Sequence, residues 1–155
     1  MRSIIRSVCL ALGIAMLAAT PALAGSEFRI TDADGIEWQS GPGSLPEGAQ
    51  MKVLAGDPGA EGPFVVRFRF PADFKVAWHT HPMTENLTLI SGAAKHETKM
   101  DEAPTDLAPG DFIHLPKNTA HKVWTLDEPA VLQLTAVGPF EIEYLDPADD
   151  PRSDD

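Results

Sequence analysis

The chain has 155 residues and a formal net charge of −11, with 23 acidic residues against 12 basic ones. This length suits one domain with one hydrophobic core. A surface this acidic repels the phosphates of nucleic acids and of anionic lipids, so we expect no nucleic acid among the partners.

The first 24 residues have the layout of a secretory signal peptide. A positively charged start, Met1–Arg6, precedes an apolar stretch, Val8–Ala19, and the small residues of Pro21–Ala24. The alternative is a membrane anchor, but the apolar stretch is shorter than the roughly 20 residues that a spanning helix needs. We therefore expect cleavage after Ala24, a periplasmic or secreted protein, and no membrane association after cleavage. Cys9, the only cysteine, would leave with this segment, so the mature protein would have no disulfide.

Residues 25–145 are predicted to form one all-β domain. Short runs rich in Val, Ile, Phe, Thr and Trp alternate with Gly, Pro, Asn and Asp, a rhythm typical of a sandwich or barrel. The expected strands are Glu37–Gln39, Gln50–Ala55, Phe64–Phe70, Phe74–His81, Glu85–Ser91, Ala93–Met100, Asp111–Leu115, His121–Leu126, Val131–Val137 and Phe140–Leu145. Residues 146–155 are acidic and contain prolines, which predicts an extended or frayed tail.

Alternation within the strands assigns side chains to faces. Four apolar residues share one face of the strand at 64–70, while Arg67 and Arg69 point the other way. In the strand at 74–81, Ala77, His79 and His81 are expected on one face and Trp78 on the other.

A metal site is predicted where that strand ends. Histidines two apart on one strand face lie roughly 6.5 Å apart along the strand, close enough to reach a common ion. Glu85 opens the next strand and His121 a later one, so both can join His79 and His81. A buried carboxylate beside buried imidazoles is costly without a counter-charge, and a divalent cation removes that cost. His79, His81, Glu85 and His121 are thus the predicted metal ligands.

These residues resemble the two motifs of the cupin superfamily. The first motif is matched by His79-x-His81-x3-Glu85-x6-Gly92 and the second by Gly110-x5-Pro116-x-Asn118-x2-His121. The resemblance spans residues 50–145. It implies a single-domain double-stranded β-helix, that is, a jelly-roll barrel of antiparallel strands. It also implies one divalent transition metal ion per chain at the four ligand positions, with Mn, Fe or Zn favoured.

Three positions depart from the cupin motifs. The glycine expected before His79 is absent, and Asp73 or Phe74 occupies that turn. Asn118 replaces a glycine but tolerates the left-handed backbone conformation, and Thr125 replaces an asparagine that does not bind metal. Two further segments, 54–58 and 144–152, resemble a subgroup of small, often secreted bacterial single-domain cupins that carries no known reaction.

The remaining candidates are interpreted as structural. His114 is expected on a half-exposed strand face, with a role beside the metal ligands as the alternative. His96 lies in a polar run and is expected to be solvated. Trp78 and Trp124 are expected to pack on the outer face, with pocket lining or a subunit contact as alternatives.

Two classes of function remain open. Four ligands leave two positions of an octahedron free, which suits catalysis or ligand capture more than a closed structural site. The first hypothesis is a metal-dependent enzyme of the dioxygenase-like oxidoreductase kind, acting on a small oxygenated molecule, with Glu85 as ligand or base. The second is a non-enzymatic periplasmic module that binds or senses a metal or metabolite. Cupins often pair, so a homodimer is also expected.

Overall fold

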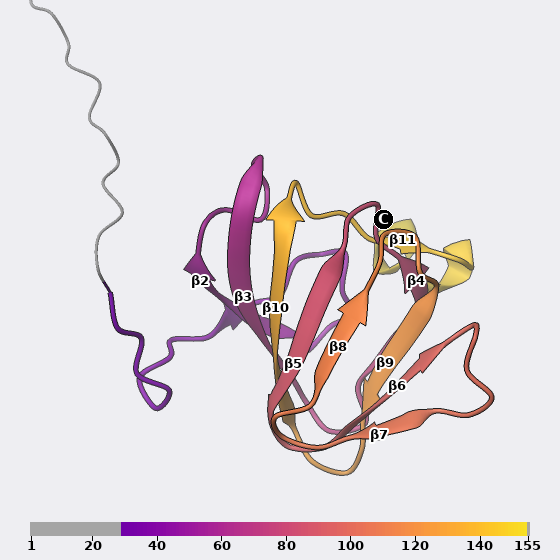
Figure 1. Cartoon of the computed structure of the whole chain (residues 1–155), viewed down its shortest axis with the longest axis horizontal. Helices are drawn as coiled ribbons and strands as arrows, with labels where there is room; N and C mark the ends of the chain where they lie inside the picture. The colour runs from indigo at the N-terminus through magenta and orange to yellow at the C-terminus, as the bar shows by residue number, and fades with distance from the viewer. Residues whose placement is uncertain (1–28, 155) are drawn as a thin grey trace, which may run out of the picture. The chain divides into compact units, whose positions relative to one another are not determined.

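The computed structural model describes residues 29–154 (Figure 1). The expected signal peptide, with Cys9, lies outside the described residues. Among the residues described, no helix has the length and apolar character needed to cross a membrane.

The described residues from Thr31 onward form an all-β unit of two antiparallel sheets, as the sequence predicts. The first sheet has the order β1-β2-β3-β10-β5-β8, and Figure 1 shows β2 to β8 of this series side by side. The second has the order β11-β4-β9-β6-β7. The strands are β1 Gln39–Ser40, β2 Gln50–Ala55, β3 Gly62–Phe70, β4 Lys75–Thr80, β5 Glu85–Ser91, β6 Ala94–Thr98, β7 Thr105–Leu107, β8 Phe112–Leu115, β9 His121–Thr125, β10 Ala130–Gly138 and β11 Glu143–Tyr144. From β3 to β11 the chain crosses between the sheets at every connection except that from β6 to β7, the topology of a jelly roll.

The core lies between the two sheets. In β3, the apolar side chains at positions 64, 66, 68 and 70 are all buried, while Arg67 and Arg69 lie on the outer face. On the inner face they are joined by Leu132 and Leu134 of β10, which pairs with β3 along its whole length. The predicted division of this strand into an apolar and a polar face is confirmed.

Strand β7 is the one element of the second sheet that the sequence pattern does not predict. It has only three residues, Thr105–Leu107, and only Leu107 is buried. Pro104 and Pro109 flank it. A short edge strand with one apolar residue leaves no period-2 pattern to detect.

The C-terminal segment is not extended, contrary to the sequence-based expectation. Two 3-10 helices, η1 Pro147–Asp149 and η2 Pro151–Asp154, follow β11. The Asp146 carboxylate caps η1 by accepting a hydrogen bond from the Ala148 amide at 3.0 Å. Asp and Pro, which made the segment look disordered, are thus the residues that start its helical turns.

Candidate metal centre

Three histidines and one glutamate converge between the two sheets. His79 near the end of β4 pairs in register with His121 at the start of β9, and His81 follows β4 directly. Glu85 opens β5 in the opposite sheet. All four side chains are buried, with exposed fractions of 1% to 4%. The strands therefore bring together the four residues named from the sequence.

A bulge in β4 changes which neighbours share the inner face. The register between β4 and β9 shifts between Val76 and His79, so two residues of β4, Ala77 and Trp78, lie opposite the single residue Lys122 of β9. As a result Val76 lines the interior beside His79, whereas Ala77 is buried against the segment that carries Asp150. The expectation that Ala77 shares a face with His79 is wrong, because strict alternation does not survive a bulge.

Backbone carbonyls fix the orientation of the three imidazoles. Nδ1 of His79 lies 2.6 Å from the Ala77 oxygen, Nδ1 of His81 2.6 Å from the Glu141 oxygen, and Nδ1 of His121 2.9 Å from the Thr119 oxygen. A carbonyl oxygen can only accept, so each Nδ1 carries the proton and donates it. Each Nε2 is then left with a free lone pair. Histidines that bind a metal through one ring nitrogen usually donate a hydrogen bond from the other nitrogen in this way.

The lone pairs of these side chains face one another. One ring nitrogen from each of the three histidines lies within 4.8 Å of the others. Oε2 of Glu85 lies 3.4 Å from Nε2 of His81 and 3.3 Å from Nε2 of His121. These nitrogens are acceptors, and Oε2 is buried without a hydrogen-bond partner. A carboxylate oxygen surrounded by acceptors is electrostatically unfavourable unless a cation lies between them.

Burial keeps the imidazoles of His79 and His81 neutral. Burial, together with the neighbouring His121 and His81, lowers the pKa of His79 to about 2. Burial also lowers the pKa of His81, although Glu85 opposes that shift. Neutral imidazole is the form that binds metal, so at neutral pH these rings are ready to act as ligands.

The turns around the site follow the sequence-based reasoning. Asn118 has the left-handed backbone expected of it, with φ 63°, and its amide donates to the His81 carbonyl at 2.8 Å. Asp73 occupies the turn where the motif glycine is missing, with φ 56°. Thr125 is buried; its hydroxyl accepts from the Phe74 amide at 2.9 Å and donates to the Pro71 carbonyl at 2.6 Å. This hydroxyl therefore ties the start of β4 to the end of β9.

An apolar cavity of about 50 Å³ opens beside the four polar residues. Its walls come from both sheets and from two loops, and include Phe68, Phe70, Leu132, Phe140 and Ile142. A water molecule needs roughly 10–15 Å³ of such space, so the cavity has room for a molecule of only a few heavy atoms.

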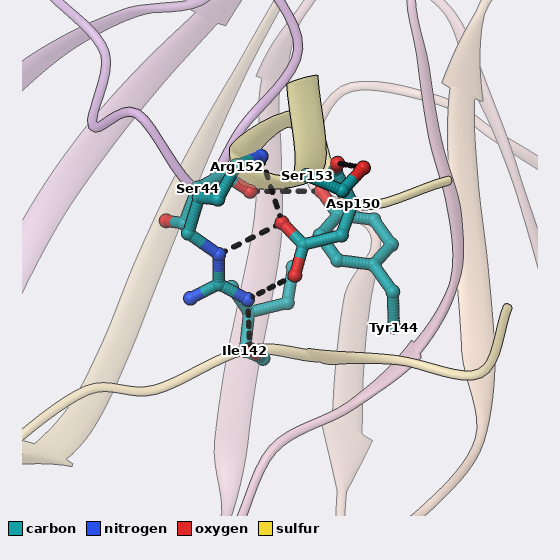
Figure 2. A network of polar contacts seen from close by, with 6 residues as sticks. All are labelled: Ser44, Ile142, Tyr144, Asp150, Arg152 and Ser153. Atoms are coloured by element: carbon teal, nitrogen blue, oxygen red, sulfur yellow. Dashed lines mark hydrogen bonds and ion pairs between the residues drawn. The ribbon is translucent and has the colours of Figure 1, made fainter. Parts of the chain in front are cut away.

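Two segments that line this cavity are held by the network in Figure 2. The Tyr144 hydroxyl donates to the Ser44 carbonyl at 2.8 Å, and Arg152 donates to the Ile142 carbonyl at 3.1 Å. Asp150 holds the Arg152 guanidinium through both of its oxygens, at 2.8 and 2.7 Å. Ser44 and Ile142 both line the cavity, so the C-terminal segment supports its wall.

His96 is buried, contrary to the expectation that it is solvated. Only 5% of it is exposed, and its ring stacks on that of His121 with centroids 5.5 Å apart. The signal was present in the sequence: Lys95, Glu97 and Lys99 alternate with Ala94 and His96, which assigns His96 to the inner face.

The other candidates lie outside the site. His114 is exposed, and its Nδ1 lies 2.8 Å from Oδ1 of Asn86. Trp78 and Trp124 are half-buried and lie beneath the ammonium groups of Lys99 and Lys122 at 3.9 to 5.0 Å. Lys122 lies on the outer face of β9 and Lys99 in the turn after β6, so the prediction of outer packing for both tryptophans is confirmed.

Residues 66–137 match the family model described as a cupin domain. This range contains all four converging residues. No curated protein matches the sequence.

Solved structures share the fold. The DMSP lyase DddQ from Ruegeria pomeroyi DSS-3 is 20% identical with a TM-score of 0.59, covering 70% of this chain and 60% of that one. This chain therefore spans less than two thirds of the lyase. The polyketide cyclase RemF from Streptomyces resistomycificus is 15% identical with a TM-score of 0.66, covering 81% and 90%. A cupin-like protein from Thermotoga maritima is 21% identical with a TM-score of 0.61, covering 77% and 96%. At these identities the likeness establishes the fold alone.

Proposed function

We propose that the chain, whose residues 66–137 match the cupin domain model, is a cupin that binds one divalent transition metal ion through His79, His81, Glu85 and His121. The observation that carries this proposal is the cluster of lone pairs without a donor: Oε2 of Glu85 lies among unprotonated Nε2 atoms, buried and unpartnered. Three imidazoles and a carboxylate suit Mn, Fe and Zn alike, and these are the ions we favour.

We further propose that the loaded protein is an enzyme acting on a small oxygenated molecule. When bound, a divalent ion supplies Lewis-acid chemistry and, if redox-active, a site for dioxygen, which would make the protein a dioxygenase-like oxidoreductase. The apolar cavity walls exclude water from whatever lies beside the four ligands. Its volume limits a fully enclosed substrate to a few heavy atoms, such as a small acid or enol. A lyase and a cyclase among the similar folds are compatible with catalysis.

Glu85 is the candidate base. Its Oε2 is buried without a hydrogen-bond partner, and among the described residues its carboxylate is the one acidic side chain lining the cavity. A carboxylate that leaves a metal can accept a proton from a substrate held against it.

The alternative is a non-enzymatic module that holds a metal or metabolite. The mostly apolar lining of the cavity favours it, because such a site can retain a ligand without any reaction. In either case we propose export to the periplasm, based on the pattern of residues 1–24, and assembly as a homodimer, which light scattering would test.

Turnover separates the two functions. The purified protein is loaded with Mn, Fe or Zn and offered a panel of small carboxylic and enolic acids, with dioxygen uptake and products recorded. Conversion that is absent from the metal-free protein supports the enzyme. Thermal stabilisation by a panel member without any product supports the module. His114→Ala, which changes an exposed histidine outside the cluster, serves as the control and should behave as the unmodified protein.

A further inference from the structure

A second hollow, of about 150 Å³, adjoins the first cavity, the one beside the four proposed metal ligands. The residues that line both are Pro42, Ser44, Phe68 and Phe140. Inner-face side chains of β3 lead from one to the other: Phe70 lines only the first cavity, Phe68 lines both, and Phe64 lines only the second hollow. The two spaces are therefore neighbours along the inner face of the first sheet.

Strand register places the second hollow close to the proposed metal site. Glu85 of β5 lies opposite Ala136 of β10, and Ala136 lies opposite Phe64 of β3. Figure 1 shows these three strands side by side. Neighbouring strands are about 4.8 Å apart, so the backbones of Glu85 and Phe64 are separated by roughly 10 Å. A molecule held beside Glu85 can therefore reach the second hollow with a chain of several carbon atoms.

The ring of Phe140 forms the boundary between the two spaces. It stacks on the His81 imidazole with centroids 4.6 Å apart, and it meets the Phe64 ring edge-on at 5.6 Å. The Phe140 amide donates to the Pro58 carbonyl at 2.7 Å, and Pro58 also lines the second hollow. This hydrogen bond holds the loop that carries the ring, so one face of Phe140 belongs to each space.

The two spaces differ in polarity. Three imidazoles and the Glu85 carboxylate line the first cavity. Among the described residues that line the second hollow, none carries a charge, and the Ser44 hydroxyl is the one polar side-chain group. Such a lining accepts hydrocarbon and disfavours a charged group, because an unpaired charge is costly to bury. A water molecule needs roughly 10–15 Å³ of such space, so the hollow has room for several carbon atoms.

We propose that the second hollow holds the apolar tail of the substrate, which is a carboxylic or enolic acid with an aliphatic chain. This inference rests on the proposed function, because the head of the molecule lies at the proposed metal site. The first cavity encloses only that oxygenated head. The tail runs past Phe140 toward Phe64 and Met51, where hydrocarbon replaces water against an apolar lining.

A series of straight-chain acids tests this assignment. Acetate, butyrate, hexanoate and octanoate are titrated by calorimetry into the full-length protein, with and without Zn²⁺. Affinity for the Zn-loaded protein is expected to rise about fourfold for each methylene group that enters the hollow, the effect of burying one CH₂. Adipate, which has the length of hexanoate but a second carboxylate, should bind at least about tenfold more weakly than hexanoate. Equal affinity for all chain lengths, or for adipate and hexanoate, would overturn the tail site.

Met51 reports where the tail lies, because it lines the second hollow and not the first cavity. Octanoate should shift the NMR signal of the Met51 methyl group, whereas acetate should not. Met51→Trp fills the hollow and should abolish the rise of affinity with chain length. Met100→Trp, the same substitution at a side chain that is 81% exposed, should keep the rise. If Met51→Trp fails to fold, the methyl signal carries the test. A rise that persists in folded Met51→Trp, or an unshifted methyl signal with octanoate, would overturn the proposal.

Failure of the tail site and failure of the proposed function give different results. Acetate that binds only the Zn-loaded protein, with no gain from longer chains, would overturn the tail site and leave the proposed metal site standing. Acetate that binds equally with and without Zn²⁺ would contradict the proposed function, and the tail site with it.

Discussion

The two polar regions around His121 differ in how their imidazoles are held. At the proposed metal site, Nδ1 of His79, of His81 and of His121 each donates a hydrogen bond to a backbone carbonyl. On the β6 side, His96 is equally buried, but its Nε2 has no partner. The first arrangement fixes tautomer and direction before any ligand arrives; the second leaves a hydrogen bond to be supplied. Pre-orientation by backbone carbonyls therefore distinguishes the three proposed metal ligands from His96.

Removing two of the pre-oriented rings should have the largest effect. The double variant His79→Ala/His121→Ala is expected to abolish metal binding, because Glu85 and His81 alone cannot enclose an ion. The unmodified protein should gain about 2.7 kcal/mol of stability at a metal concentration 100 times the dissociation constant, and the variant none. Thermal unfolding with and without metal measures this. Equal metal-induced stabilisation in both proteins would contradict the assignment.

Acid should destabilise the metal-free protein through both regions. The pKa values of His79, His81 and His96 are lowered in the fold, so below about pH 6.5 the unfolded chain binds more protons than the folded one. Stability is therefore complete above that pH and falls as pH decreases toward about 4 for His96 and about 2 for His79, by at most about 1.4 kcal/mol per pH unit for each group. Urea unfolding across this range, repeated with His96→Leu, should show a shallower slope in the variant. Identical slopes would mean that His96 stays solvated.

Replacing the glutamate should separate folding from metal binding. Glu85→Gln removes the charge and supplies an amide that can donate to the Nε2 atoms of His81 or His121. The metal-free variant is expected to be more stable by about 1–3 kcal/mol, the cost of an orphaned buried polar group, whereas its metal affinity should fall at least about tenfold, or about 1.4 kcal/mol. Unfolding and metal titration give the two values. A variant that is less stable without metal would show that Oε2 is not orphaned in solution.

The smallest effect on metal binding is expected at the far end of β4, where no ligand lies. Thr125→Val leaves the Phe74 amide without its hydroxyl acceptor and should cost about 1–3 kcal/mol of stability, while metal affinity is unchanged. Thr125→Ser keeps the hydroxyl and is the matched control. A parallel loss of metal affinity in Thr125→Val would mean that this tether also positions His79.

The sequence predicted the sheets and the converging residues because both depend on short-range patterns. The structure shows the predicted alternation of buried and outward side chains in β3. It also places His79 opposite His121, as the motif spacing predicts. Features that depend on contacts between distant strands were missed. The bulge beside His79 arises from pairing with β9, and the three-residue β7 exists only as a partner of β6. The burial of His96 was within reach of the alternation argument, but its charged neighbours concealed it.

The metal content of the protein, purified from its native host without added metals or a chelating tag, tests the central claim most directly. The account predicts close to one transition metal ion per chain in the unmodified protein and in His114→Ala. Full occupancy in His79→Ala/His121→Ala, or a metal-free native protein that takes up no ion when titrated, would contradict it.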